Sequence, residues 1–109
     1  MYKKGTVVLT PFPFTDLSGT KVRPAVIISH NLRGDDVMLL FITSRKEKTG
    51  AHTIPVKPNA YNGLRTTSRI LCDKIATVDK KIILGELGAL HKDTVHKIDT
   101  TLKKVLGMR

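Results

Sequence analysis

One stretch restricts the fold of this chain more than any other: an apolar run that follows two basic residues and a proline. Residues 21–29 read KVRPAVIIS. Valine and isoleucine suit a pleated, packed surface, and a short apolar run bounded by turn signals is typical of a buried strand. Pro24 is tolerated at the first residue of such a strand, and it biases Arg23 toward an extended backbone. The sequence therefore predicts a core strand that begins with a guanidinium.

Five further segments have the pattern of short strands, separated by turn-rich stretches. Pro11 and Pro13 are expected to end the regular pairing of the first segment, because proline has no backbone donor. Pro55 favours an edge position for the segment that contains it. The segments are residues 5–10, 37–43, 52–56, 68–78, which is one long strand or two strands around a bend, and 82–90, where Gly85 and Gly88 suggest a bulge or a close backbone approach.

The last stretch of the chain changes its hydrophobic period from that of a strand to that of a helix. Asp93 lies near the expected start of the helix and Gly107 just after its end. One face carries the apolar residues, which are Val95, Ile98, Leu102, Val105 and Leu106. Six short strands followed by a helix predict a mainly β fold, a small antiparallel barrel with a C-terminal helix packed on it.

The length of the chain, 109 residues, leaves room for one domain, residues 1–109, with one modest core. No apolar run approaches the roughly 20 residues that a membrane span requires, and the N-terminus shows no signal-peptide pattern. Cys72 is the only cysteine, so no intrachain disulfide can form, and a reducing compartment fits. We therefore expect a soluble, cytoplasmic protein.

The charge of the chain indicates what it binds. Nineteen Lys and Arg residues against nine Asp and Glu residues give a formal net charge of +10 and a pI near 10.1. A small basic domain is typical of a nucleic-acid binder or of a protein with an acidic protein partner, and a merely soluble basic surface is the alternative. The positive residues are spread along the chain, so a basic tail does not explain the charge.

The residues give no indication of a metal or cofactor site. The chain has no phosphate-cradling glycine loop, no dinucleotide fingerprint and no nucleophile elbow. Cys72 lies among apolar neighbours and is expected to pack rather than to react. The histidines lack the spacing of zinc ligands and are expected to be surface residues; they are His30, His52, His91 and His96.

The remaining candidates for chemistry lie at the ends of two core strands. Arg23 begins one strand, and Thr43 and Ser44 end the next. The short connection allows these strands to pair antiparallel, which brings the two ends to the same rim of the sheet. A guanidinium beside two hydroxyls can bind a phosphodiester and stabilise charge that develops on it. The pattern therefore predicts a site built around Arg23 and Thr43.

Other charged residues lie near these strand ends in the sequence. Arg45, Lys46 and Lys48 follow Ser44 in the adjoining loop and are placed to hold flanking phosphates. Asp73, with Lys74 beside it, interrupts an otherwise apolar strand, where a carboxylate needs a partner. It is a base, a reader of base edges or one half of a salt bridge.

The chain resembles the MazF/PemK (Kid) toxins. The resemblance lies in GTVV at residues 5–8, VRPAVIIS at residues 22–29 and LFITS at residues 40–44. It continues in SRILCDKIATVDK at residues 68–80, in the segment from Gly85 to Leu90 and in the closing amphipathic helix. These motifs follow one another in the family's order over nearly the whole chain.

The resemblance implies an SH3-like barrel of the CcdB/Kid/MazF type that works as a homodimer and is blocked by a cognate antitoxin. It implies a metal-independent, ribosome-independent endoribonuclease that cuts single-stranded RNA at short sequences. Arg23 and Thr43 match the family's catalytic pair, Asp73 matches an acidic residue that some members use, and Ser44 is a possible helper. The residues expected to bind RNA are Ser18, Lys21, Arg45, Lys46, Lys48 and Lys74.

The implied chemistry is attack by the RNA 2′-hydroxyl on the adjacent phosphorus, which leaves a 2′,3′-cyclic phosphate. Arg23 would stabilise the pentacoordinate phosphate and Thr43 would position it. Two alternatives remain: a gyrase-poisoning toxin like CcdB, built on the same barrel, and a barrel that binds nucleic acid without catalysis. An arginine–hydroxyl pair favours the ribonuclease, because a gyrase binder has no use for it.

Overall fold

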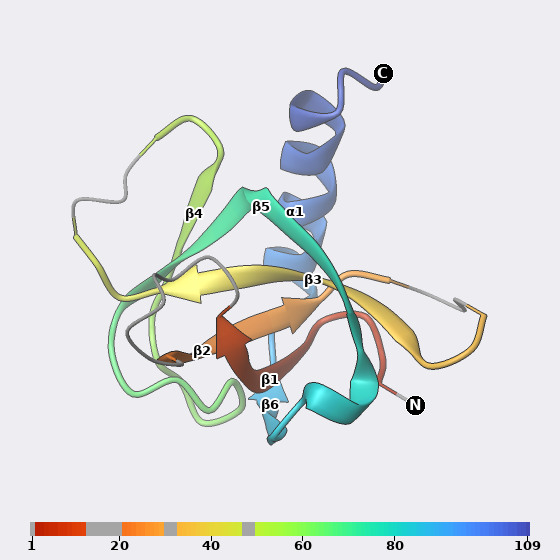
Figure 1. Cartoon of the computed structure of the whole chain (residues 1–109). Helices are drawn as coiled ribbons and strands as arrows, with labels where there is room; N and C mark the ends of the chain where they lie inside the picture. Colours follow the sequence, from red (N-terminus) through yellow and green to blue (C-terminus); the bar gives the residue numbers. More distant parts are fainter. Residues whose placement is uncertain (1, 13–20, 30–32, 47–49) are drawn as a thin grey trace.

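The computed structural model describes residues 2–12, 21–29, 33–46 and 50–109, and the strands in this part of the chain form one antiparallel sheet (Figure 1). Its strands are β1 (Thr6–Phe12), β2 (Lys21–Ile27), β3 (Asp36–Thr43), β4 (Thr53–Val56), β5 (Ser68–Asp79) and β6 (Gly85–Ala89). A 3-10 turn, Lys80–Ile82, follows β5, and helix α1, Lys92–Val105, follows β6.

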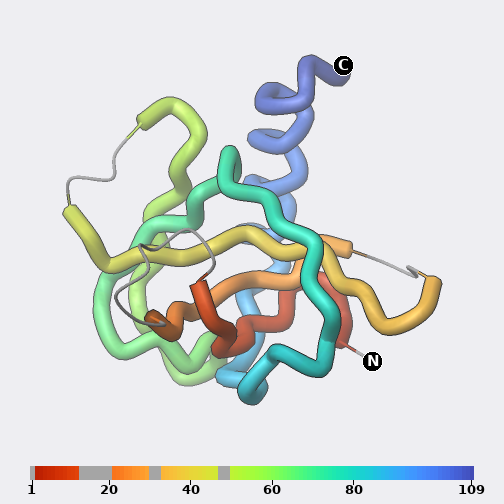
Figure 2. Tube along the Cα trace, viewed as in Figure 1, coloured from red at the N-terminus to blue at the C-terminus, as the bar shows by residue number. Residues whose placement is uncertain are grey.

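The strands lie in the order β4-β5-β3-β2-β1-β6, and every neighbouring pair is antiparallel. The long strand β5 arches over the other strands, so the sheet curls into a half-barrel (Figure 2). The expected mainly β fold with a C-terminal helix is therefore confirmed. The edge position expected for β4 is confirmed as well. Among the described residues no helix is both long and apolar enough to cross a membrane.

The continuous apolar runs of the sequence are explained by burial on both faces of the sheet. Neighbouring residues such as Val7 and Val8 are fully buried but belong to two different hydrophobic clusters, because side chains alternate across a strand. One cluster contains Val26, Leu40 and Ile98 of α1, so it lies between the sheet and the helix. The other lies on the opposite face and is formed by Val8, Ala25, Ile27, Val37, Leu39 and Phe41.

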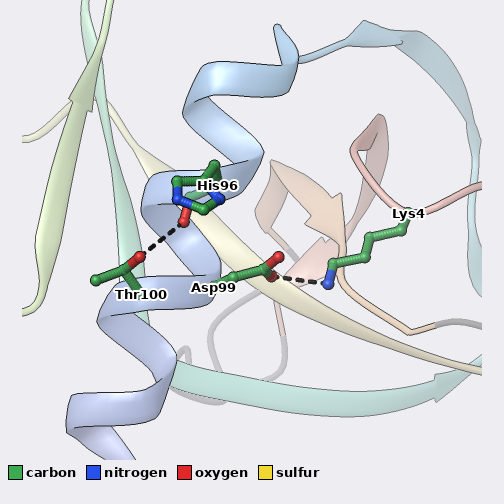
Figure 3. A network of polar contacts seen from close by, with 4 residues as sticks. All are labelled: Lys4, His96, Asp99 and Thr100. Atoms are coloured by element: carbon green, nitrogen blue, oxygen red, sulfur yellow. Dashed lines mark hydrogen bonds and ion pairs between the residues drawn. The ribbon is translucent and has the colours of Figure 1, made fainter.

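Helix α1 packs on the sheet through the apolar stripe that the sequence predicts. Ile98 is buried, and Val95, Leu102 and Val105 pack against the same cluster. Leu106, which the periodicity also placed on this face, is instead the C-cap residue and is exposed, because the helix ends before it. A partly exposed ion pair between Lys4 Nζ and Asp99, 2.7 Å long, adds a second contact (Figure 3); such pairs contribute little to stability.

Strand β1 is longer than expected, because Pro11 does not end its pairing; Pro13 lies outside the described residues. Pro11 stands opposite Val22 and Phe12 opposite Lys21. On the other side of β1, pairing with β6 stops at Leu9, so Pro11 has a neighbouring strand on one side alone. A proline is tolerated where no ladder donor is required. The extension places Phe12 at the end of β1, opposite Lys21 at the start of β2.

Gly88 lies where the loop that contains Tyr61 passes directly over β6. The Ala89 N–H donates a 2.9 Å hydrogen bond to the Tyr61 carbonyl oxygen. A Cβ atom at residue 88 would stand 2.1 Å from that oxygen, whereas one at Gly85 would have nothing within 4 Å. The register between β1 and β6 also shifts between Val7 and Val8. The expected bulge and close backbone approach are thus found in this strand, with the close approach at Gly88.

We expect Gly88→Ala to lower the free energy of unfolding by about 3 kcal/mol or more, because backbone must move to admit the methyl group. Gly85→Ala is the matched control in the same strand and is expected to change stability by less than about 1 kcal/mol. Equilibrium urea unfolding of both variants beside the wild type measures the difference. Equal midpoints for the two variants would contradict the close packing described here.

Candidate functional site

A cavity of about 390 Å³ opens where the ends of several strands meet. Among the described residues, its wall is formed by the end of β1, the start of β2, the end of β3, the segment that leads into β4 and the middle of β5. The residues are Phe12, Arg23, Phe41, Ile42, Thr43, Arg45, Gly50, Ala51, His52, Thr53, Leu71, Asp73 and Lys74.

Strand register brings Arg23 and Thr43 together. In the pairing of β2 with β3, Ala25 stands opposite Phe41. Arg23 lies two residues before Ala25 and Thr43 two residues after Phe41, so antiparallel pairing carries both toward the same end of the sheet, and both residues line the cavity. Because side chains alternate, Arg23 and Thr43 lie on the same face of the sheet as Ala25 and Phe41. The two strand ends therefore meet at one rim, in the arrangement expected from the sequence.

Two aromatic rings support the Arg23 side chain. Its Cζ atom lies 5.5 Å from the centroid of the Phe12 ring, which is cation–π distance. The Phe12 ring in turn meets the buried Phe41 ring edge to face, with centroids 4.8 Å apart and planes at 89°. A guanidinium that rests on an aromatic ring can still donate hydrogen bonds from its N–H groups to an anion. Neither aromatic residue was identified as a site residue from the sequence.

Thr43 is 7% exposed, and its hydroxyl oxygen already has a partner. The backbone N–H of Arg45 donates to Thr43 Oγ1 over 3.2 Å. A hydroxyl that accepts through one lone pair still has its own proton to donate. Thr43 is thus held with its rotation restricted and with a donor left for a group that enters the cavity.

A local break in the strand register carries Asp73 and Lys74 to the cavity. Leu40 pairs with Ile75, and Ile42 pairs with Ile70. Four residues of β5 therefore stand opposite one residue of β3, and β5 bends there. Of the two arrangements expected for residues 68–78, the single long strand is the one found, and it contains this bend. Asp73 and Lys74 are exposed on the cavity wall, so the Asp73 carboxylate is not the buried group that the apolar surroundings suggested.

His52 corrects the expectation that the histidines are surface residues. It is partly buried, lines the cavity, and its Nδ1 atom is fully buried. Its backbone carbonyl accepts a 3.0 Å hydrogen bond from Cys72 N–H, which fixes this segment against β5. His91 and His96 are exposed as expected, and His30 lies outside the described residues.

The remaining candidates lie around the cavity rather than in its wall. Ser44 and Lys46 are exposed beside Thr43 and Arg45, and Lys21 is exposed at the start of β2. None of these three is among the described residues of the wall. The candidates Ser18 and Lys48 lie outside the described residues.

Cys72 is fully buried in the core cluster between sheet and helix. Burial raises the pKa of its thiol to about 11, and the neighbouring Asp73 carboxylate adds to the shift. The thiolate is scarce at neutral pH, so Cys72 is a packing residue and not a nucleophile. Across the described part of the chain, no group of three or more potential protein ligands is arranged to hold a metal ion.

The charges on the cavity wall favour an anion. Among its described residues the wall carries three positive side chains, Arg23, Arg45 and Lys74, and one carboxylate, that of Asp73. An arginine on an aromatic support, beside a hydroxyl donor, is a combination that binds phosphate oxygens well. The cavity is therefore suited to a phosphodiester.

A family model for "PemK-like, MazF-like toxin of type II toxin-antitoxin system" matches residues 3–106. An endoribonuclease from a mycobacterial species, solved in complex with its cognate antitoxin, has 25% sequence identity and a TM-score of 0.79. That comparison covers 100% of this chain and 98% of the other. No curated protein shows significant similarity to this chain.

Two further solved structures share the fold. Another mycobacterial endoribonuclease is 26% identical, with a TM-score of 0.71 over 96% of this chain and 90% of the other. A MazE–MazF crystal structure from Deinococcus radiodurans contains a chain that is 23% identical, with a TM-score of 0.75 over 99% of this chain and 98% of the other. The similarity thus extends over essentially whole chains.

Proposed function

Because the chain belongs to the PemK-like, MazF-like toxins of type II toxin–antitoxin systems, we propose that it is an endoribonuclease that cuts single-stranded RNA at short sequences, without a metal ion or the ribosome. Two mycobacterial proteins of the same fold, 25% and 26% identical, are endoribonucleases. The observation that carries the proposal is that Arg23 and Thr43 line the same cationic cavity of about 390 Å³.

The proposed reaction needs no nucleophile from the protein. The RNA 2′-oxygen loses its proton and forms a bond to the adjacent phosphorus, while the bond from phosphorus to the 5′-oxygen breaks and that oxygen takes up a proton. The products are a 2′,3′-cyclic phosphate and a 5′-hydroxyl. DNA lacks the attacking hydroxyl, so selectivity for RNA comes with the chemistry.

Arg23 and Thr43 act on the charge that develops at phosphorus. The pentacoordinate state carries more negative charge on its non-bridging oxygens than the substrate does. The guanidinium of Arg23, held over Phe12, donates in-plane hydrogen bonds to those oxygens. The Thr43 hydroxyl, which accepts a hydrogen bond from the Arg45 N–H, donates a hydrogen bond to the phosphate and orients it for in-line attack. Asp73 lines the same cavity, where a carboxylate can accept a proton.

Residues around the cavity would hold the rest of the strand. Arg45 and Lys74 on its wall, and Lys21 and Lys46 beside it, contribute positive charge for flanking phosphates. The same charge suits an acidic antitoxin segment that blocks the cavity, and one structural neighbour was solved with its cognate antitoxin. We further propose that the toxin is a cytoplasmic homodimer.

The proposal is tested with purified protein, a mixed-sequence single-stranded RNA and DNA of the same sequence, all in excess EDTA. The expected result is a small set of discrete cuts in the RNA and none in the DNA. Intact RNA with folded protein would reject the ribonuclease, and supercoiling by DNA gyrase in the presence of the protein would then test the CcdB-like alternative.

A further inference from the structure

The proposed reaction does not use His52, whose Nδ1 atom is buried. Its Nδ1 atom is one of two buried side-chain polar atoms in the described part of the chain that lack a hydrogen-bond partner. The other, Thr10 Oγ1, does not line the cavity. Burying a polar atom without a partner costs free energy. The unpaired Nδ1 atom of a residue that lines the candidate active site therefore requires an explanation.

The absence of a hydrogen-bond partner at Nδ1 indicates which ring nitrogen of His52 carries the proton. A neutral imidazole has one N–H donor and one bare nitrogen. A proton on Nδ1 would be a buried donor without an acceptor, and the doubly protonated ring would have the same unpaired donor. The arrangement with the lower cost has the bare nitrogen at Nδ1 and the proton on Nε2. His52 is partly buried and lines the cavity while its Nδ1 atom is buried, so we infer that Nε2 is the ring nitrogen accessible from the cavity.

The surroundings of His52 indicate what this N–H meets. The backbone carbonyl of His52 accepts a hydrogen bond from Cys72 N–H on β5, so His52 lies beside the part of β5 that carries Asp73 and Lys74. Arg23 and Arg45 are the other charged residues of the described wall. The three positive side chains of the described wall favour a ligand with an anionic oxygen. A hydrogen bond to such an oxygen is stronger than one to a neutral acceptor.

We propose that His52 is a further catalytic residue, which donates a hydrogen bond from Nε2–H to a non-bridging oxygen of the scissile phosphodiester. It acts as a neutral donor and does not transfer a proton, because a general base would need a bare Nε2. This inference rests on the proposed ribonuclease function. His52, next to β4 and β5, would thus contact the same phosphate as Arg23.

Three variants separate this role from the others. His52→Phe keeps a planar ring and removes the donor. His52→Gln keeps an N–H at about the distance of Nε2 but cannot act as an acid or base. His96→Gln changes an exposed histidine on α1, outside the cavity, and is the matched control (Figure 3). Thermal unfolding of each variant shows whether it is folded.

Cleavage of a mixed-sequence single-stranded RNA is measured under single turnover across pH 5 to 9. His52→Phe is expected to lower the maximal rate by roughly 10- to 100-fold, the effect of one hydrogen bond to a charged group. His52→Gln is expected to stay within about fivefold of the wild type, with a pH–rate profile of the same shape. A His52→Phe rate equal to that of the wild type would overturn the proposal. So would a His52→Gln variant as slow as His52→Phe that loses one limb of the profile, because that result identifies a proton-transfer residue.

A binding measurement keeps this inference distinct from the proposed function. The same sequence made as DNA cannot react by the proposed route, and its affinity is measured by fluorescence anisotropy. His52→Phe is expected to weaken binding severalfold and His52→Gln to leave it nearly unchanged. If the wild-type protein leaves RNA intact, the ribonuclease proposal fails, and the binding series alone then decides: equal affinities for all variants reject a phosphate contact by His52.

Discussion

Replacing Arg23 with alanine is expected to lower the rate of RNA cleavage by about 10³-fold while the protein remains folded. The Arg23 Cζ atom lies 5.5 Å from the Phe12 ring centroid, and the side chain lines the cavity in which the proposed transition state develops negative charge. Arg23 is at the start of β2 and only half-buried, so its loss removes little core packing. The measurement is single-turnover cleavage of a mixed-sequence single-stranded RNA, with thermal unfolding recorded for the same samples.

Arg23→Lys refines this prediction. Lysine keeps the charge but loses the planar fork and the stacking geometry, so it is expected to recover only a small part of the activity. Arg65→Ala removes an exposed arginine that is not on the described cavity wall, and serves as a control for the loss of one positive charge. If Arg23→Ala and Arg65→Ala cleave at similar rates, Arg23 is merely one of many surface charges and the proposed role is wrong.

The second large effect is expected at Thr43. Thr43→Val has nearly the same shape but no hydroxyl, and should lower cleavage by roughly 10- to 100-fold. The variant also removes the acceptor for the Arg45 N–H, so the adjoining loop loses one contact with the end of β3. Thr43→Ser keeps the hydroxyl in reach of both partners and should stay within about tenfold of the wild type.

Single-turnover kinetics on the same RNA measure the Thr43 series. Thr100→Val, on the exposed side of α1 (Figure 3), is the control for a threonine hydroxyl that is not on the described cavity wall. The role proposed for Thr43 requires Thr43→Ser to be clearly faster than Thr43→Val. Equal rates for those two variants would show that the hydroxyl does not matter and that Thr43 contributes shape alone.

The sequence was sufficient to predict the elements, because each carries a local signal. The apolar run after Pro24 became β2, and its placement of Arg23 at the edge of the core follows from proline's restriction of the preceding residue. The stripe around Ile98 became the buried side of α1. The short link between β2 and β3 required antiparallel pairing, and that pairing is what brings Arg23 and Thr43 to the same end of the sheet.

What the sequence could not supply depends on registers and on contacts between distant segments. The bend of β5 arises because four of its residues oppose one residue of β3, and no local pattern specifies that number. Phe12 follows a proline that suggested an end to pairing, and Phe41 lies in an apolar run in which either face could be the functional one. The position of His52 depends on its tie to Cys72, twenty residues further along the chain.

The account's central claim is that RNA supplies its own nucleophile in the Arg23 cavity. The most direct test uses two RNAs that differ by one oxygen: a sequence that the wild type is found to cut, and the same sequence with a single 2′-deoxynucleotide on the 5′ side of the cut bond. In excess EDTA, the first is expected to yield a 2′,3′-cyclic phosphate and a 5′-hydroxyl, and the second to remain intact at that bond. Cleavage of the deoxy-substituted bond at a comparable rate would mean that water or a protein group attacks the phosphorus, and would contradict the account.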